Sequence, residues 1–402
     1  MKYIMIVPDG MADDKVPQLN NRTPLDCADM PTVKELAMRG EIGLVKTIPD
    51  HMPPGSDVAN LSVMGYDPEK YYTGRSSLEA VSIGIDLSEV DITFRCNLVT
   101  LSGEEDYAQK TMLHHSADEI TTEEAKVLIH DLAKELQTEE IQFYPGVGFR
   151  HVVVWNNGPD DFELTPPHDI LGRKIEEYLP KGPSKDVILN MMIQSNRILK
   201  DHPINQSRIE RGLKPANSIW IWGLGKKPIL DSFYEKYKLK GSVISAVDLI
   251  KGIGICAGMK SIDVEGATGN IHTNFEGKTA AALKELENGQ DFVYVHIEAP
   301  DECGHQGDYI NKVRSMEWID SRVVKPIVEK LDAWGEPYKI LILPDHPTPL
   351  SIRTHTADPV PFVLYDSTKE QMHPQYRFTE KAAQKSGIYF DAGYKLTDYF
   401  LK

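Results

Sequence analysis

Phe292-Val-Tyr-Val-His-Ile297 is followed at once by Glu298-Ala-Pro-Asp301-Glu-Cys-Gly-His305. The first six residues are almost continuously apolar, which is typical of a strand buried on both faces of a parallel sheet. The residues that follow carry acidic and imidazole side chains. In open α/β sheets, ligands bind at the carboxyl ends of the strands. This stretch therefore predicts both a doubly covered sheet and a site at its edge.

The same pattern occurs twice more. The buried run Tyr3–Val7 leads into Asp9, and Ile340–Leu343 leads into Asp345-His346, with His355 a little further on. Asp301 and His305 are spaced i, i+4, so one helical turn presents both to a single metal ion. Carboxylate with imidazole favours Mn²⁺ or Zn²⁺ over Mg²⁺, which prefers oxygen ligands. Each side chain alone has an ordinary alternative as a cap, a turn residue or a core histidine, but together they predict a metal site.

Strand-like and helix-like segments alternate along most of the chain, which predicts an α/β sandwich around a largely parallel sheet. Further strands are expected at Gly43–Ile48, Ser218–Trp222, Gly241–Ile244 and Val360–Tyr365, and helices at Thr32–Arg39, Lys278–Leu286 and Asn311–Leu331.

The middle of the chain has a different character. A capping box at Thr121 begins a helix that runs to about Leu136, Arg150–Trp155 is strand-like, and Ser184–Lys200 is helical. Proline and glycine gather at both margins. We therefore predict an inserted α+β domain at 96–215, with 1–95 and 216–402 forming the main domain.

Ser56 is the candidate nucleophile. Pro53-Pro-Gly55-Ser56-Asp57 is a proline-glycine turn that leads into an amphipathic helix. The ordinary alternative is that Ser56 is the N-cap. A serine hydroxyl needs a base or a metal to become a good nucleophile, and a helix N-terminus favours bound phosphate. No GxSxG motif competes for this role.

Composition excludes some classes of partner. The formal net charge is −16, which disfavours binding to nucleic acid and to anionic membranes. The four cysteines form no CxxC pair, which is typical of a reducing cytosol, and the N-terminus does not resemble a signal peptide. The most apolar later stretch, Val243–Met259, is interrupted by Asp248 and Lys251. We therefore expect a cytoplasmic protein without a membrane span.

Together these segments resemble the archaeal-type 2,3-bisphosphoglycerate-independent phosphoglycerate mutase family of the alkaline phosphatase superfamily, over nearly the whole chain. The segments that carry the resemblance include Asp9-Gly10, Pro54-Gly55-Ser56-Asp57, Gly65-Tyr66-Asp67-Pro68, Phe94-Arg95-Cys-Asn97, His202-Pro-Ile-Asn205, Glu265-Gly-Ala-Thr-Gly269, Asp345-His346-Pro-Thr-Pro349 and His355-Thr-Ala-Asp-Pro359. The resemblance implies an alkaline-phosphatase-like sandwich with an inserted domain.

The resemblance also implies a mechanism. Two divalent metal ions are expected, Mn²⁺ first, with Zn²⁺ or Mg²⁺ as alternatives. One ion would be held by Asp9, Ser56, Asp345 and His346, and the other by Asp301, His305 and His355. Ser56 would carry the phosphoryl group as phosphoserine while the enzyme, an isomerase of glycolysis, interconverts 3- and 2-phosphoglycerate. The inserted domain would close over this small phosphorylated metabolite.

One segment departs from the family pattern. Lys110–Asp118 contains no arginine where the mutases are arginine-rich, and in this it resembles a bacterial branch proposed to be a homoserine kinase. The substrate anions need other partners. The candidates are Arg95, Arg150, His115, Arg75, Arg208 and Arg211. Surface charge is the ordinary alternative for the last two, and Lys260 and His272 are assigned no role.

Three functions remain open from the sequence. The first is the mutase, and the second is a phosphotransferase that uses the same site on another small substrate such as homoserine. No Walker lysine loop or kinase glycine-rich loop is present to hold ATP, which weakens the second. The third is an inactive metal-binding module, against which the complete ligand set stands.

Overall fold

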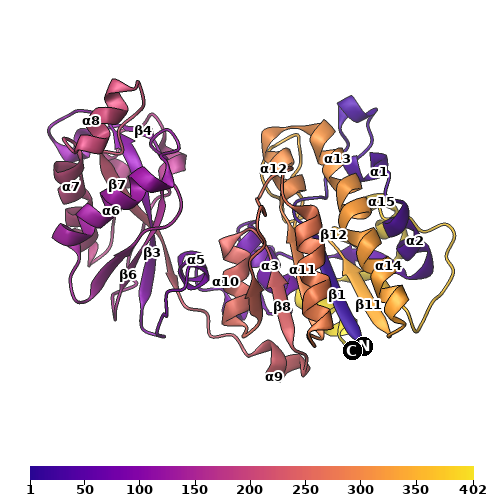
Figure 1. Cartoon of the computed structure of the whole chain (residues 1–402). Helices are drawn as coiled ribbons and strands as arrows, with labels where there is room; N and C mark the ends of the chain where they lie inside the picture. Colours follow the sequence, from indigo (N-terminus) through magenta and orange to yellow (C-terminus); the bar gives the residue numbers. More distant parts are fainter. The chain divides into compact units, whose positions relative to one another are not determined.

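The computed structural model describes all residues, 1–402, and divides into two compact units. Unit 1 comprises Met1–Tyr72 and Ile229–Lys402, and unit 2 comprises Thr73–Pro228 (Figure 1). The predicted boundaries at 96 and 215 therefore lie inside unit 2. The reason is that β3 (Ile92–Leu101) and β7 (Ser218–Lys226) pair with each other, so neither strand belongs to the main sheet.

Unit 1 is built on an eight-stranded sheet with the order β13-β2-β12-β11-β1-β10-β8-β9. Its strands are β1 (Lys2–Pro8), β2 (Glu41–Val45), β8 (Gly241–Ile244), β9 (Lys260–Ile262), β10 (Phe292–Ile297), β11 (Tyr338–Ile342), β12 (Val360–Asp366) and β13 (Tyr389–Phe390). In the centre, β1 runs parallel to both β10 and β11, while β12 is antiparallel to its two neighbours. The predicted largely parallel sheet is confirmed, and the carboxyl ends of its central strands lie at one edge.

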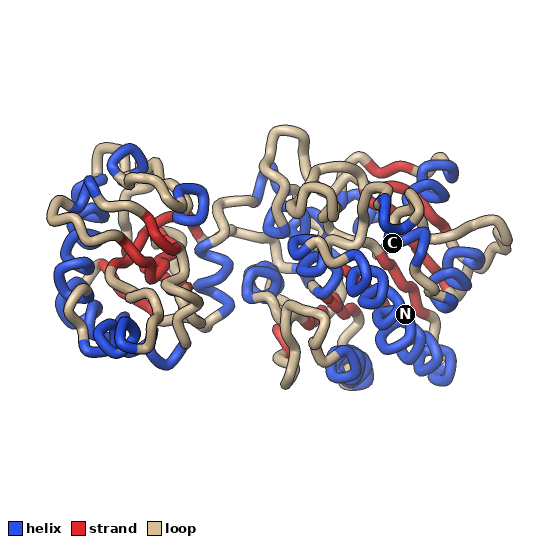
Figure 2. The backbone as a smooth tube through the Cα atoms, turned by 90° about the horizontal axis from the view of Figure 1, so that it is seen from above, coloured by secondary structure: helices blue, strands red, loops and turns tan.

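Helices cover both faces of this sheet, as the views in Figures 1 and 2 show. Alternate strand residues such as Ile4, Val295 and Ile340 share one apolar core with α2 (Pro31–Arg39), α11 (Phe275–Glu287), α13 (Tyr309–Ile319) and α14 (Lys325–Trp334). The opposite face carries α3 (Ser56–Val63), which packs against α10 (Asp248–Cys256) and α16 (Gly393–Phe400). The remaining helices of unit 1 are α1 (Pro24–Cys27), α4 (Pro68–Tyr71), α9 (Phe233–Tyr237), α12 (Ala299–Gln306) and α15 (Glu380–Ser386).

The long helix predicted at Asn311–Leu331 is interrupted. A π-helical turn at Asp320–Val324 separates α13 from α14. Pro326 follows directly, and because it lacks an N–H and crowds the preceding turn, the regular hydrogen-bond ladder cannot continue through it. The turn also serves packing, since the Asp320 carboxylate accepts from Val33 N at 2.7 Å at the start of α2.

Unit 2 has a five-stranded antiparallel sheet in which β3 pairs with β4 (Met112–His114), β6 (Arg150–Trp155) and β7, and β6 pairs with β5 (Ile141–Tyr144). Its helices are α5 (Ser76–Ser82), α6 (Thr122–Leu136), α7 (Lys185–Leu199) and α8 (Pro203–Glu210). The helices and the strand predicted in the middle of the chain are confirmed to within a residue or so. None of the helices in either unit combines the length and the apolar composition that a membrane crossing requires.

Candidate metal centre

Three neighbouring strand ends deliver acidic side chains to one place. Asp9 follows β1, Glu298 follows β10, and Asp345 lies just beyond β11. Because these strands are parallel, the backbone register alone brings the carboxylates to the same edge. Two groups of possible ligand atoms result, one of Asp9, Asp345 and His346 and one of Asp9, Glu298 and Asp301, each within 4.8 Å.

Helix α12 supplies the second part of the site. Asp301 Oδ2 lies 3.1 Å from His305 Nε2, as their i, i+4 spacing predicts. His355 joins them from a loop, with Nε2 at 3.4 Å from Asp301 Oδ1 and 3.0 Å from His305 Nε2. Two imidazole nitrogens that face each other beside a carboxylate are an arrangement suited to a shared cation.

His346 links the two parts. Its Nε2 lies 3.5 Å from Asp9 Oδ1 and 3.4 Å from Asp345 Oδ2, and all three side chains are buried. His346 also forms a group with Asp301 and His355 within the same 4.8 Å limit. The structure thus brings all the sequence-predicted ligands together in one continuous cluster.

Ser56 is directed into this cluster. The N-cap of α3 is Gly55, in an extended conformation, and Ser56 is the first helical residue. The alternative that Ser56 is the N-cap is therefore wrong. The Ser56 hydroxyl instead lies 3.0 Å from His346 Nε2.

Asn60, one turn further along α3, fixes the position of the serine. Its amide nitrogen donates to Ser56 O at 2.8 Å and to Asp345 Oδ2 at 2.6 Å. Its amide oxygen accepts from the Tyr294 hydroxyl at 2.5 Å. Because every amide group of this buried side chain is engaged, α3 and the Asp345 carboxylate are held together as one piece.

The electrostatics of the cluster fit a bound cation. Burial, and next the charge of Asp345, raise the pKa of Asp9 well above its usual range. Asp9 Oδ1 is buried and has no hydrogen-bond partner. Several carboxylates thus share a space with too few positive charges, and a divalent ion would supply both the charge and the missing partner.

The histidines respond to the same carboxylates. A hydrogen bond with Asp301 raises the pKa of His305 to about 9, whereas burial lowers the pKa of His346. Burial alone would raise the pKa of Asp301. The hydrogen bonds from His305 and His355 outweigh this effect and hold the pKa well below its usual range. Asp301 is thus favoured in its ionised form and His346 in its neutral form, which are the forms that bind metals, whereas a metal at His305 would have to displace a proton.

Sequence reasoning missed several residues of this region. Glu298 follows β10 just as Asp9 follows β1, and this position was the signal that could have found it. His296 lies inside β10, with Nε2 at 3.0 Å from Asp9 Oδ2, and Lys278 Nζ donates to its carbonyl oxygen at 2.8 Å. Both lie within elements whose periodicity indicates only burial, so the sequence offers no comparable signal for them.

A separate group of candidate residues lies in unit 2. Glu79 accepts from Arg75 Nε at 2.8 Å and pairs with Arg95 Nε at 3.0 Å. Arg150 is a diagonal neighbour of Arg95, because Asn97 and Arg150 are paired across β3 and β6. His115 joins through its carbonyl oxygen, which accepts from Asn97 Nδ2 at 3.2 Å. The structure therefore brings four of the six predicted substrate residues into one part of unit 2.

Arg208 and Arg211 have different surroundings. Both guanidinium groups pair with Glu124, and Arg208, only 1% exposed, also donates to Ala117 O. These ion pairs hold the C-terminal end of α8 against the start of α6. The contacts are those of residues that stabilise the fold.

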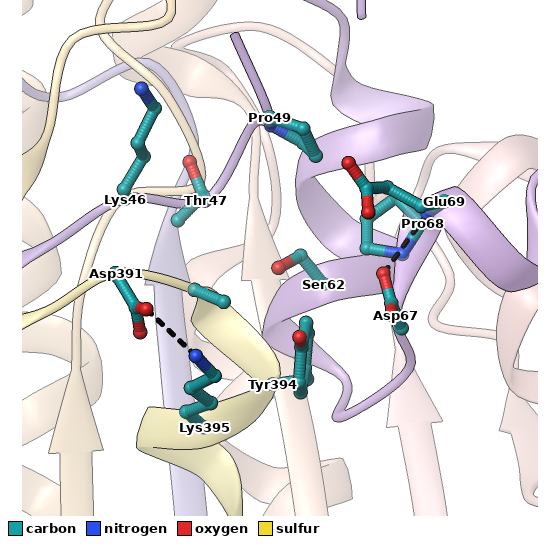
Figure 3. Close-up of a pocket in the computed structure, with 11 residues that line it drawn as sticks. Lys46, Thr47, Pro49, Ser62, Asp67, Pro68, Glu69, Asp391, Tyr394 and Lys395 are labelled. Atoms are coloured by element: carbon teal, nitrogen blue, oxygen red, sulfur yellow. Dashed lines mark hydrogen bonds and ion pairs between the residues drawn. The ribbon is translucent and has the colours of Figure 1, made fainter.

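A cavity of about 160 Å³ in unit 1 lies outside the cluster (Figure 3). Its lining includes Ser62 near the end of α3 and Lys395 on α16, and the Lys395 ammonium is paired with Asp391 at 2.7 Å. None of the predicted site residues lines it.

Comparison with known proteins identifies the family. The family profile described as 2,3-bisphosphoglycerate-independent phosphoglycerate mutase matches residues 37–205. A probable enzyme of that name from Geobacter sulfurreducens is 48% identical over 401 residues, covering 100% of both chains. The chain belongs to the 2,3-bisphosphoglycerate-independent phosphoglycerate mutase family. A mutase from Methanosarcina mazei is 47% identical over 389 residues, 96% of each chain.

Solved structures agree with this assignment. A Pyrococcus horikoshii protein has a TM-score of 0.83 at 30% identity, covering 100% of this chain and 96% of its own. The cofactor-independent phosphoglycerate mutase from Thermoplasma acidophilum has a TM-score of 0.66 at 26% identity, covering 100% and 99%. The resemblance and the α/β fold class predicted from the sequence are thus confirmed.

Proposed function

We propose that this chain is a metal-dependent phosphoglycerate mutase that interconverts 3-phosphoglycerate and 2-phosphoglycerate through a phosphoserine at Ser56. Membership of the family supports the reaction. The observation that carries the mechanism is the position of the Ser56 hydroxyl, 3.0 Å from His346 Nε2 at the centre of the carboxylate–imidazole cluster. Ser56 does not cap the helix, and its hydroxyl points toward the proposed reacting centre.

The proposed reaction has two balanced halves. In the first, Ser56 Oγ bonds to phosphorus, the bond from phosphorus to the glycerate 3-oxygen breaks, and the serine proton ends on that oxygen. In the second, the glycerate 2-oxygen bonds to phosphorus, the bond from phosphorus to Ser56 Oγ breaks, and the proton of the 2-hydroxyl ends on Ser56 Oγ. The N-terminus of α3 favours the phosphoryl charge in both halves. Asn60 keeps the serine backbone in place throughout.

The ligand sets are proposed as the family resemblance implies them. Asp9, Ser56, Asp345 and His346 would hold one divalent ion, and Asp301, His305 and His355 the other, with Mn²⁺ preferred. When bound, such ions polarise the phosphoryl oxygens and lower the pKa of the attacking hydroxyl. The unpartnered Asp9 Oδ1 and the raised pKa of Asp9 support the proposal that positive charge belongs here.

Unit 2 is proposed to bind the anionic groups of the substrate. Arg75 and Arg95 are held in place by Glu79, and Arg150 is exposed and makes no ion pair. Guanidinium groups suit both phosphate and carboxylate. His115 adds a neutral donor, since burial lowers its pKa. The predicted closing of this unit over the substrate is part of the same proposal.

The direct test is a coupled enolase assay on the purified protein with Mn²⁺ and 3-phosphoglycerate. We expect formation of 2-phosphoglycerate that stops on addition of a chelator and returns with Mn²⁺. Homoserine with ATP, run in parallel, tests the phosphotransferase alternative. Turnover of homoserine without turnover of phosphoglycerate would overturn the mutase proposal.

A further inference from the structure

Thr348 contacts both halves of the proposed metal site. It lies in the loop after β11 and is fully buried. Its hydroxyl donates to Asp301 Oδ1 and lies 3.3 Å from His346 Nδ1. Asp301 and His346 belong to different proposed ligand sets, so one small side chain contacts a ligand of each.

The direction of these hydrogen bonds follows from the chemistry of the groups. A threonine hydroxyl has a single hydrogen, and an ionised carboxylate only accepts. Because that hydrogen goes to Asp301, the hydroxyl can only accept from His346. His346 Nδ1 therefore carries the ring hydrogen, and Nε2 keeps its lone pair. This lone pair faces Ser56 Oγ, 3.0 Å away, and lies beside Asp9 Oδ1 and Asp345 Oδ2 at 3.5 and 3.4 Å, where a cation would be held.

The loop that carries Thr348 is firmly anchored. Lys312 Nζ donates to Thr348 O at 2.7 Å and to Asp13 Oδ2 at 2.7 Å, and the Lys312 and Asp13 side chains are both 0% exposed. Asp13 in turn accepts from Leu350 N at 3.2 Å. The Lys312–Asp13 ion pair thus bonds to the backbone at Thr348 and at Leu350 and ties this loop to α13.

Two glycines, each in a segment that carries a proposed ligand, lie very close to Thr348. A Cβ at Gly304, in α12, would lie 2.6 Å from Thr348 O, and one at Gly10 would lie 2.5 Å from Thr348 Oγ1. Both positions therefore require glycine, and Thr348 packs directly against the backbone of two segments that carry ligands.

We propose that Thr348 is a positioning residue that sets the tautomer of His346 and the orientation of Asp301, and so couples the two halves of the metal site. The inference rests on the proposed metal site and goes beyond it, because Thr348 is not itself a ligand. Residues that orient metal ligands in this way typically account for about 10–100-fold in metal affinity.

The test compares three variants by titration calorimetry with Mn²⁺ on the full chain. Thr348→Val keeps the shape but removes the hydroxyl, and we expect Mn²⁺ affinity to fall about 10–100-fold. Thr348→Ser keeps the hydroxyl and should restore most of the affinity. Thr397→Val is the matched control, because Thr397 is also buried and its hydroxyl bonds only to the backbone oxygens of Val63, at 2.7 Å, and Gly393, neither of which is a proposed ligand.

A second readout does not depend on metal or on the stability of a variant. In the metal-free wild-type protein, ¹⁵N NMR of the histidine rings should show His346 with its hydrogen on Nδ1. A hydrogen on Nε2 would overturn the proposal, as would a folded Thr348→Val variant that binds Mn²⁺ as tightly as the wild type. A wild-type protein that binds no divalent ion would instead overturn the metal site itself, which is a different result.

Discussion

The two units gather charged side chains in opposite ways. At the sheet edge of unit 1, carboxylates crowd together, and burial with the charge of Asp345 raises the pKa of Asp9 well above its usual range. In unit 2, arginines surround Glu79. Burial alone would raise the pKa of this carboxyl, but the charges of Arg95 and Arg75 outweigh burial and lower it. The first cluster lacks positive charge and the second has it in excess. This difference supports the proposal that the site in unit 1 binds cations and the site in unit 2 binds an anion.

The largest effect should come from the centre of unit 1. Ser56→Ala removes the nucleophile, and we expect phosphoglycerate turnover to fall by roughly 10⁴-fold or more. Mn²⁺ binding by the Asp301 half should be retained, because that half does not contact Ser56. The coupled enolase assay and Mn²⁺ titration measure the two quantities separately.

Ser62→Ala is the control for this experiment. Ser62 lies on the same helix but lines the cavity of Figure 3 instead of the cluster, so its removal should leave turnover unchanged. An alanine at position 56 that kept a tenth of the wild-type rate would rule out the phosphoserine mechanism.

The second effect concerns the buried Lys312–Asp13 ion pair, which supports the loop beside the unit 1 cluster. Lys312→Met leaves the fully buried Asp13 carboxylate without its partner, and breaking such a pair costs about 3–5 kcal/mol. We expect the free energy of unfolding in urea to fall by this amount. Lys395→Met removes an exposed pair with Asp391 that solvent screens, and it should leave the free energy of unfolding almost unchanged. Equal losses in the two variants would contradict the structural role of Lys312.

The sequence could predict the unit 1 site because its residues follow a simple rule. Asp9 and Asp345 lie at or just beyond the ends of buried parallel strands, and Asp301 and His305 share a helical face, so local pattern and register bring them together. Thr348, Asn60 and Lys312 could not be found in this way. Their roles depend on which side chains meet after the layers pack, and each position has an ordinary reading as a loop or a buried helical residue.

The domain boundaries were wrong for a related reason. Ser218–Trp222 has the same apolar character as a strand of the main sheet, and only its pairing with β3 shows that it belongs to unit 2. Likewise, Arg208 and Arg95 both belong to unit 2, yet Arg208 pairs with Glu124 and Arg95 with Glu79. Antiparallel pairing between distant strands leaves no local signal from which either result could be read.

The third effect tests the excess of positive charge in unit 2. Arg150 is exposed and makes no ion pair, and its guanidinium carbon lies 4.5 Å from the centre of the Phe149 ring. Arg150→Met keeps an apolar side chain that can cover this ring, so the free energy of unfolding should change only slightly. If Arg150 holds a substrate anion, KM for 3-phosphoglycerate should rise roughly ten- to hundred-fold, the value of a lost charged hydrogen bond.

Arg211→Met serves as its control, because Arg211 already pairs with Glu124. Its KM should stay at the wild-type value. A KM that does not respond to the change at Arg150 would mean that the anion site of unit 2 lies elsewhere.

The smallest effect concerns the one carboxylate among these arginines. The pKa of Glu79 is lower in the folded state, so its contribution to stability is fully present above the unfolded value of about 4.3 and is lost as pH falls through the folded pKa. Glu79 and Arg95 keep 18% and 14% of their side chains exposed, which places the contribution between an exposed and a buried pair, at about 1–2 kcal/mol.

Hydrogen exchange of the β3 amides in wild type and Glu79→Gln measures this contribution. At pH 7 the variant should be less protected by that amount, since Arg75 and Arg95 lose their shared partner. The difference should shrink as pH falls below the unfolded pKa of about 4.3 and vanish once the pH lies below the folded pKa of Glu79. Glu123→Gln is the matched control, because Glu123 is exposed and makes no ion pair, so its protection should equal that of the wild type at every pH. If instead the Glu79→Gln variant were more protected at pH 7, the carboxylate would be a cost to folding. Glu79 would then serve to orient the arginines for the substrate, and KM for 3-phosphoglycerate would rise in the variant.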